Sequence, residues 1–288
     1  MPASALCLQL GPALVAHYHH TEGICLRRVD YSNTSQVAAF LTADAGRLSV
    51  MAKGVTRAPK RGVRTALDLL SRYEIIYTTR RSGSLHNLTY RWLRERPYRP
   101  GGPLEGLLCA YYAAELMLNF VPEDVPCPGL YEALLRAVRG FRTGERLGAG
   151  VLLLELAVLK EHGSCPTFDS CVACGRGVPA RGAVAFSSAA GGPLCRRCRQ
   201  GEEGPAGRRT TTRANLLHTL AALAAADVAV SSPVPALPVR DTLAMSALLR
   251  FHMRDLLSRN LRLWKYLEGR RLSRSLRRLR RANGSRTA

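Results

Sequence analysis

Four cysteines in the second half of the chain have the spacing of a metal site. They form two pairs, Cys171-x2-Cys174 and Cys195-x2-Cys198, with twenty residues between the pairs. A CxxC turn lets two thiolates converge on one ion, and two such turns complete a tetrahedral Zn²⁺ site. Because four sulfurs leave no position for water, the spacing predicts one structural zinc ion rather than a catalytic one.

Alternative interpretations of these cysteines make different demands on their surroundings. A thioredoxin-like redox motif needs a CxxC at the start of a helix that follows a strand, and neither pair has this setting. Disulfides are not expected, because the chain has nine cysteines, an odd number, and no export signal. Unligated thiols remain the simple alternative. The other cysteines are expected to be ordinary residues, with Cys165 the only one near enough to replace a ligand: Cys7, Cys25, Cys109, Cys127 and Cys165.

Arginines surround the two cysteine pairs. They offset the negative charge of a zinc tetrathiolate and leave positive charge for phosphate groups. Arg181 is one of these surrounding arginines, and we expect four others to contact DNA: Arg176, Arg196, Arg197 and Arg199.

The charge of the whole chain points to a polyanionic partner. Its 288 residues carry 42 Lys and Arg against 21 Asp and Glu, a formal net charge of +21. This charge is segregated, since residues 83–165 are neutral whereas residues 250–288 carry 13 basic and 2 acidic residues. Such a distribution favours nucleic acid as the partner.

Neither a membrane span nor a signal peptide is predicted. The apolar run "GVLLLELAVL" is shorter than the ~18 residues that a spanning helix needs, and it contains Glu155. The first twenty residues lack a basic n-region and a convincing cleavage site. We expect a cytoplasmic, nucleoid-associated protein.

Residues 22–82 are predicted to form a small β domain. The stretch from Ile24 to Met51 is rich in β-branched and aliphatic residues and is broken at "YSNTS" and "ADAG", and "ALDLLSRYEIIYTTRR" suggests further strands. About five strands in this length suit a Greek-key barrel of the OB type. The basic loop of this barrel is expected to contact DNA through Lys53, Arg57, Lys60, Arg61 and Arg64, although such a loop can also be simply solvated.

Several aromatic residues and histidines near this domain have two interpretations. Tyr31, Tyr73 and Tyr77 are able to stack on bases, but at least two of them are expected to lie in the core or in strand pairs. His17, His19 and His20 form a possible metal-binding cluster, and an incidental grouping is the simpler explanation.

Residues 83–268 are predicted to be α-helical, with the zinc finger inserted at about 166–200. Apolar residues recur at intervals of three and four in segments beginning at Leu104, Gly129, Gly148, Ala214 and Val239. Four glutamates on these helices are interpreted as surface or local ion-pair residues: Glu115, Glu132, Glu155 and Glu161. The ends are assigned as an N-terminal extension (1–21) and a basic C-terminal tail (269–288) that favours DNA over an anionic membrane.

The order of these elements, together with three short segments, resembles the RecO family of bacterial recombination mediators. "FLTADAGRLSVMAKGVTR" is similar to the strand–turn–strand of the family that ends in a KG-plus-basic signature. "LLLELAVLKEHGSCPTFDSCVACGR" and "GGPLCRRC" resemble its helix leading into the two zinc knuckles. The resemblance implies an α+β protein, with an N-terminal OB-type β-barrel and then an α-helical domain carrying an inserted four-cysteine zinc finger.

The resemblance also implies a function in the RecFOR pathway of DNA repair. The family binds single- and double-stranded DNA, anneals complementary strands, and works with RecR and the single-stranded-DNA-binding protein to load the recombinase. The acidic, hydrophobic C-terminal tail of that protein is implied to bind the helical domain. Catalytic residues are not expected, since no Ser-His-Asp set, phosphate-cradling loop or paired-carboxylate centre stands out.

Two other classes of function remain open from the sequence. An RNA-binding accessory protein would share the charge and the OB fold. A zinc-dependent enzyme would need an open coordination position, and four cysteines argue against one.

Overall fold

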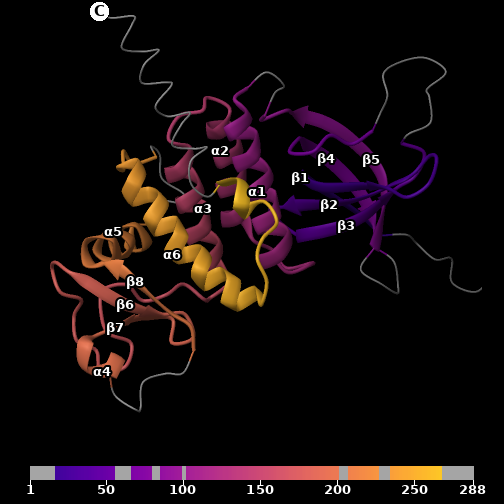
Figure 1. Cartoon of the computed structure of the whole chain (residues 1–288). Coiled ribbons are helices and arrows are strands. Elements are labelled where there is room, and N and C mark those ends of the chain that lie inside the picture. Colours follow the sequence, from indigo (N-terminus) through magenta and orange to yellow (C-terminus); the bar gives the residue numbers. More distant parts are fainter. Residues whose placement is uncertain are drawn as a thin grey trace, which may run out of the picture.

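The computed structural model places a β-barrel, a helical bundle and a small finger in a row. It describes residues 17–55, 66–79, 85–98, 102–200, 207–226 and 234–267. Figure 1 shows the barrel at one end of the molecule, the bundle in the middle and the finger at the other end. The predicted α+β class and order of domains are confirmed. Among the described residues, no helix is long and apolar enough to cross a membrane.

The barrel closes five strands in the order β1-β2-β3-β5-β4. The strands are β1 (Tyr18–Asp30), β2 (Gln36–Thr42), β3 (Gly46–Ala52), β4 (Arg72–Thr78) and β5 (Leu85–Glu95). The pairing of β3 with β5 is parallel and all other pairings are antiparallel. In β3 and β4 buried residues alternate with half-buried ones, because successive side chains point into and out of the barrel.

The barrel runs past the boundaries that its sequence suggests. The predicted end of the domain at residue 82 falls in a Gly/Ser stretch between the paired strands β4 and β5, so the barrel continues to Glu95. At the other end β1 begins at Tyr18, because residues of the assigned extension pair with β4. Of the described residues 66–79 within "ALDLLSRYEIIYTTRR", only Arg72–Thr78 forms a strand.

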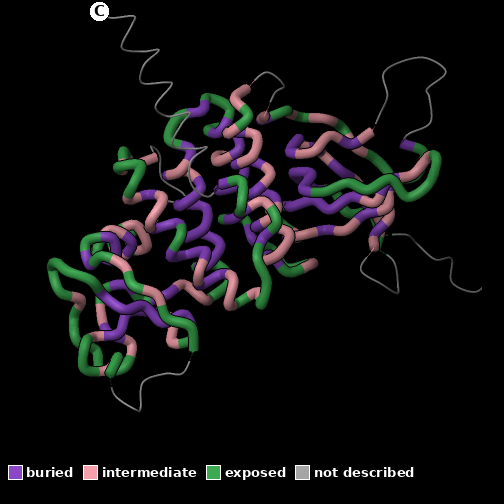
Figure 2. The backbone as a smooth tube through the Cα atoms, viewed as in Figure 1, coloured by how far each residue is buried: buried purple, intermediate pink, exposed green. Residues whose placement is uncertain are grey.

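The bundle is built around one central helix. Its helices are α1 (Leu104–Phe120), α2 (Pro128–Phe141), α3 (Leu147–Glu161), α5 (Ala214–Ala225), α6 (Val239–Leu257) and the short α7 (Trp264–Leu267). From Val151 to Leu159 every residue of α3 is buried, which Figure 2 shows as purple tube in the middle of the molecule. A helix that is apolar all round belongs in the interior, so α3 has no solvent-facing stripe over these residues.

One glutamate of α3 corrects the expectation from the sequence. Glu155 was expected at the surface or in a local ion pair, but its exposed fraction is 0%. Its Oε1 lies 3.3 Å from Nε of Arg250 in α6 and accepts a 2.8 Å hydrogen bond from the Tyr112 hydroxyl in α1. Burial raises the pKa of this carboxyl, while the Arg250 charge opposes the rise. The side chains of Glu155, Arg250 and Tyr112 therefore link α3, α6 and α1 inside the bundle.

The barrel and the bundle share a core and a polar joint. Ile24, Leu26 and Leu41 belong to the same buried cluster as the helices. Glu123, after α1, accepts hydrogen bonds from Arg47 (2.8 Å) and Ser49 (2.6 Å) of β3. Next to them, Gly46 has φ +64°, and a Cβ there would lie 1.8 Å from the carbonyl oxygen of Val125, so this contact requires glycine.

The finger comprises β6 (Ala183–Ser187), β7 (Gly192–Leu194), α4 (Arg196–Gln200) and β8 (Arg209–Arg213). Its sheet has the order β7-β6-β8. The insertion therefore continues beyond the predicted end at residue 200, because β8 returns to pair with β6 before α5 begins.

Candidate metal centre and nucleic-acid interface

The two cysteine pairs sit in turns that the local sequence shapes. After the first pair the chain folds back, so that the Gly175 N–H donates to the Cys171 carbonyl at 2.8 Å. Gly175 has φ +72°, a conformation that glycine adopts without strain. The second pair begins at the end of β7 and continues into α4, with the Arg199 N–H donating to the Cys195 carbonyl at 2.9 Å.

The structure brings the four predicted ligands together. The Sγ atoms of Cys171, Cys174, Cys195 and Cys198 all lie within 4.8 Å of one another. The Sγ atoms of Cys174 and Cys195 are 3.8 Å apart. Tetrahedral Zn²⁺ with Zn–S bonds of about 2.3 Å requires neighbouring sulfurs about 3.8 Å apart, so these residues fit that ion. Within the described part of the chain, this is the only group of three or more His, Cys, Asp or Glu close enough to hold a metal.

The remaining cysteines and the histidine cluster follow their simpler interpretation. Cys25, Cys109 and Cys127 are buried, and Cys165 is half-buried and lies outside the cluster, while Cys7 lies outside the described residues. Burial raises the pKa of Cys25 and Cys109 to about 12. His19 stacks on Tyr77 with ring centroids 5.0 Å apart, and His20 pairs with Glu74.

Hydrogen bonds from backbone N–H groups favour the thiolate form of two of the metal-site cysteines, Cys171 and Cys195. Burial raises the pKa of Cys171, but hydrogen bonds from the backbone of Cys195, Ala173 and Cys174 outweigh it and lower the pKa to about 6. The Cys195 pKa is also lowered, chiefly by the N–H of Cys198. By contrast, the interaction with the Cys195 sulfur raises the pKa of Cys198 to about 12. Neighbouring thiolates repel one another, and a divalent cation removes that conflict.

The finger is fixed to the bundle through a phenylalanine and a histidine. Phe186 of β6 is fully buried in the core cluster that contains the helices. His252 of α6 donates from Nε2 to the Ser164 carbonyl at 3.0 Å, so its Nδ1 accepts from the Ser188 hydroxyl at 3.1 Å. Burial lowers the pKa of His252, which favours the neutral ring that this arrangement needs.

The finger also presents the predicted cations to solvent. All five arginines named from the sequence are exposed: Arg176, Arg181, Arg196, Arg197 and Arg199. Two further arginines were not singled out. Arg208 stacks on the ring of Phe251, and Arg209 donates to the Arg199 carbonyl at 3.1 Å. Arg208 precedes β8 and Arg209 begins it, and the basic doublet ahead of three threonines in "RRTTTR" was the signal available for them.

On the barrel, the described part of the basic loop lies beside an open pocket. Lys53 is exposed, whereas Arg57, Lys60, Arg61 and Arg64 lie outside the described residues. The pocket is lined by Tyr31, Ser32, Thr34, Ser35, Met51, Lys53 and Gly54. Tyr31 is 70% exposed there, while Tyr73 and Tyr77 are buried in the barrel core as expected. Tyr31 is thus the one of the three tyrosines able to stack on a base.

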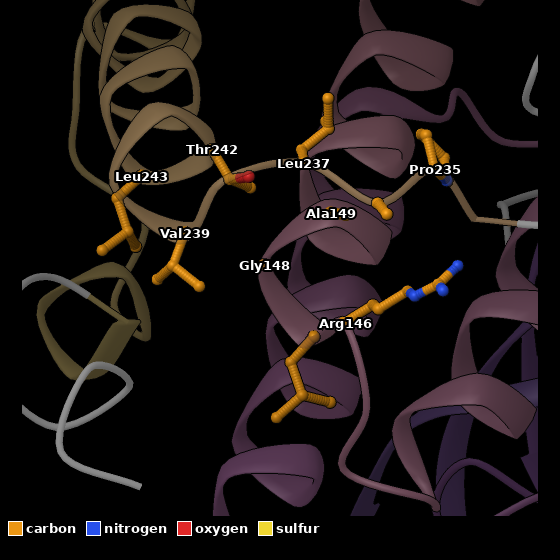
Figure 3. Close-up of a pocket in the computed structure, with 10 residues that line it drawn as sticks. Arg146, Gly148, Ala149, Pro235, Leu237, Val239, Thr242 and Leu243 are labelled. Atoms are coloured by element: carbon orange, nitrogen blue, oxygen red, sulfur yellow. The ribbon is translucent and has the colours of Figure 1, made fainter. Parts of the chain in front are cut away.

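A second, apolar pocket lies between α3 and α6 in the bundle. Its volume is about 180 Å³, and most of its lining is aliphatic: Leu147, Ala149, Pro235, Ala236, Leu237, Val239 and Leu243. Figure 3 shows Arg146 at one end of this pocket, across from Thr242 and Val239. The pocket has room for one or two apolar side chains next to a guanidinium group.

The chain thus combines a five-stranded OB-type barrel, a helical domain and an inserted four-cysteine finger with exposed arginines. Two family models match the chain: Recombination protein O N terminal over residues 16–95 and Recombination protein O C terminal over residues 103–265. The chain belongs to the RecO family of DNA repair proteins.

Individual relatives agree with this assignment. A DNA repair protein RecO of Rhodopirellula baltica is 36% identical over 178 residues, which are 61% of this chain and 65% of the relative. The protein of the same name in Anaeromyxobacter sp. strain K is 30% identical over 229 residues, 80% of this chain and 88% of the relative. A third, from Moorella thermoacetica, is 33% identical over 187 residues, 63% of this chain and 67% of the relative.

Proposed function

We propose that the protein is a non-enzymatic DNA-binding mediator. In this role it binds single- and double-stranded DNA, anneals complementary strands and helps to load recombinase onto DNA coated by single-stranded-DNA-binding protein, in a repair pathway of the RecFOR type. The observation that carries the proposal is the placement of the barrel, which carries the exposed Lys53, and of the finger, which carries the exposed arginines, at opposite ends of one molecule of the RecO family.

Positive charge explains how such a protein anneals DNA without a covalent step. Two complementary strands repel each other through their phosphates, and cations that neutralise phosphates lower this repulsion. One strand bound at the barrel loop and another at the finger would both lie on cationic surface. Contacts of this kind read phosphates rather than bases, so annealing would be independent of sequence and would need no nucleotide.

The metal in this proposal is one structural zinc ion. Four sulfurs complete its coordination and leave no site for substrate water. The finger has a small apolar cluster of its own, formed by Cys171, Ala185 and Leu194. So small a cluster needs the metal to hold the finger arginines in place.

Two protein partners belong to the proposal, RecR and the single-stranded-DNA-binding protein. The pocket between α3 and α6 suits the tail of the latter, because its aliphatic lining matches an apolar side chain and Arg146 can pair with a carboxylate. Part of its lining, Arg146 to Ala149, lies in the neutral segment 83–165, where a peptide competes little with DNA for cationic surface. We place the protein in the cytoplasm, associated with the nucleoid.

Charge reversal in the basic loop tests the DNA-binding part of the proposal. Lys60→Glu with Arg61→Glu is expected to weaken binding to a single-stranded oligonucleotide and to flatten its salt dependence, with a slope change of about one per lost phosphate contact. Fluorescence anisotropy across a series of salt concentrations measures both. The matched control is Lys160→Glu, an exposed lysine on the neutral bundle. An unaltered salt slope in the loop variant, equal to that of the control, would remove the loop from the DNA interface.

A further inference from the structure

The outer surface of the barrel carries three exposed aromatic rings on β1 and β5, the two strands that flank β4. Tyr18 of β1 is 68% exposed, and Tyr90 and Trp92 of β5 are 47% and 57% exposed. Strand register places them on one face, because Ile76 of β4 lies opposite both His20 and Tyr90. We call this surface the aromatic face: Tyr18, His20, Ile76, Tyr90 and Trp92.

These rings point away from the barrel core. Residues of β4 that face outward alternate with the buried Tyr73, Ile75 and Tyr77, and Glu74, opposite Trp92, is one of the outward set. In Figure 2 the outer part of β5 is drawn in pink and green, the colours of half-buried and exposed residues. A group of large exposed aromatic side chains on a folded protein marks a binding surface more often than a surface without a partner.

The acidic groups around the aromatic face are already paired with cations. Glu74 accepts hydrogen bonds from His20, at 2.5 Å, and from Arg94. Glu22 pairs with Arg72 at 3.2 Å. These pairs reduce the repulsion that a carboxylate would exert on a phosphate. The Arg94 side chain stays 45% exposed, and a guanidinium with five N–H donors retains some for a further acceptor.

The aromatic face leads to the basic end of the barrel. Beyond Trp92, Arg94 and then Arg96 follow along the chain, and Arg96 pairs at 3.0 Å with Asp68. Asp68 lies just after the segment that contains Lys60, Arg61 and Arg64. The Arg28 side chain donates to the carbonyl of the adjacent Leu67. Exposed rings and exposed guanidinium groups thus follow one another along β5 and just beyond its end.

We propose that single-stranded DNA stacks its bases on Tyr90 and Trp92, with Tyr18 extending the same platform, while its backbone passes Arg94 and Arg96. Alternate residues of a strand lie about 7 Å apart, so Tyr90 and Trp92 can each take a separate base. Base–aromatic stacking is tolerant of sequence, as an annealing protein needs. This inference rests on the proposed function and adds a contact distinct from the pocket at Tyr31.

The proposal explains how one protein distinguishes single strands from duplex. In a duplex the bases are paired and stacked on each other, so they are not available to Tyr90 and Trp92. The aromatic face should therefore contribute to the binding of single strands only, and its contribution should change little with salt because it neutralises no phosphate.

Tryptophan fluorescence provides a direct measurement, because the chain has two tryptophans in different surroundings. Trp92 is 57% exposed, whereas Trp264 is 9% exposed and lies beside Arg250. Titration of the full-length protein with oligo(dT) is expected to quench the emission of Trp92. The Trp264→Phe variant, which retains only Trp92, should keep this quenching. A duplex of the same length should quench much less.

Affinity measurements with variants decide the outcome. Trp92→Ala is expected to weaken oligo(dT) binding about tenfold or more, with unchanged salt slope and unchanged affinity for duplex. Trp92→Phe should retain most of the affinity, and Tyr266→Ala, which replaces an aromatic residue on α7 that is 40% exposed, should have no effect. Thermal unfolding confirms that the variants are folded.

The possible failures are distinguishable. If the wild-type protein binds oligo(dT) with no quenching of Trp92, and Trp92→Ala binds equally well, the aromatic face is not a DNA site and a protein partner is its better explanation. In that case the proposed function stands on the basic loop and the finger. If the wild-type protein binds no DNA at all, the proposed function and this inference both fail.

Discussion

Cys171→Ser and Cys198→Ser are each expected to abolish stoichiometric zinc binding and to unfold the finger. The four Sγ atoms lie within 4.8 Å of one another, and removal of one leaves three sulfurs and an open position. Structural zinc contributes about 10–16 kcal/mol to the folding of isolated finger peptides near neutral pH, so the loss should be large. Elemental analysis gives the metal content, and limited proteolysis reports the opening of the finger.

The matched control for this prediction is Cys165→Ser. Cys165 is half-buried and lies before the first knuckle, but it does not belong to the cluster. Its replacement should leave the zinc content at one ion per chain. Equal zinc content in Cys171→Ser and in the wild-type protein would show that the metal is not held here.

Arg250→Met is expected to destabilise the whole bundle by about 3–5 kcal/mol, because it leaves the Glu155 carboxylate buried without its charge partner. The carboxyl of this variant should bind a proton to escape the penalty, which raises its pKa above that in the unfolded chain. The loss in free energy of unfolding should then be small below pH 4.3, which is about the pKa of a glutamate in the unfolded chain. It should grow as the pH rises toward the pKa of Glu155 in the folded variant. Urea unfolding at several pH values measures it.

The double variant Glu155→Leu with Arg250→Met separates loss of the ion pair from loss of packing. It removes both charges together, so most of the lost stability should return. Arg259→Met, which removes an exposed arginine that contacts Asn119, should change the free energy of unfolding by less than about 0.5 kcal/mol. A double variant as unstable as Arg250→Met would show that the cost comes from packing alone.

The metal ligands were predictable from sequence because their geometry is local. Each CxxC pair closes its own turn, and only the meeting of the two turns depends on the finger sheet. The partner of Glu155 was not predictable in this way. The run "GVLLLELAVL" identifies a buried helix, but one carboxylate within it does not reveal Arg250, which comes from another helix much later in the chain.

Strand limits were harder to predict where composition and pairing disagree. The Gly/Ser stretch before Leu85 has the composition of a linker, yet it joins two strands of one barrel. The segment Arg209–Arg213 has no aliphatic residue, and only its pairing with β6 makes it a strand. The aromatic face was missed for a related reason, since Tyr90 and Trp92 alternate with arginines and become a surface only when β5 lies beside β4.

The most direct test of the central claim is annealing of two complementary oligonucleotides, each already coated with single-stranded-DNA-binding protein, in the absence of ATP. We expect this protein to accelerate duplex formation, and we expect a smaller acceleration from the double variant Lys60→Glu, Arg61→Glu. No acceleration, together with intact binding to the same oligonucleotides when naked, would contradict a mediator and leave a basic, metal-binding protein that binds nucleic acid without remodelling it.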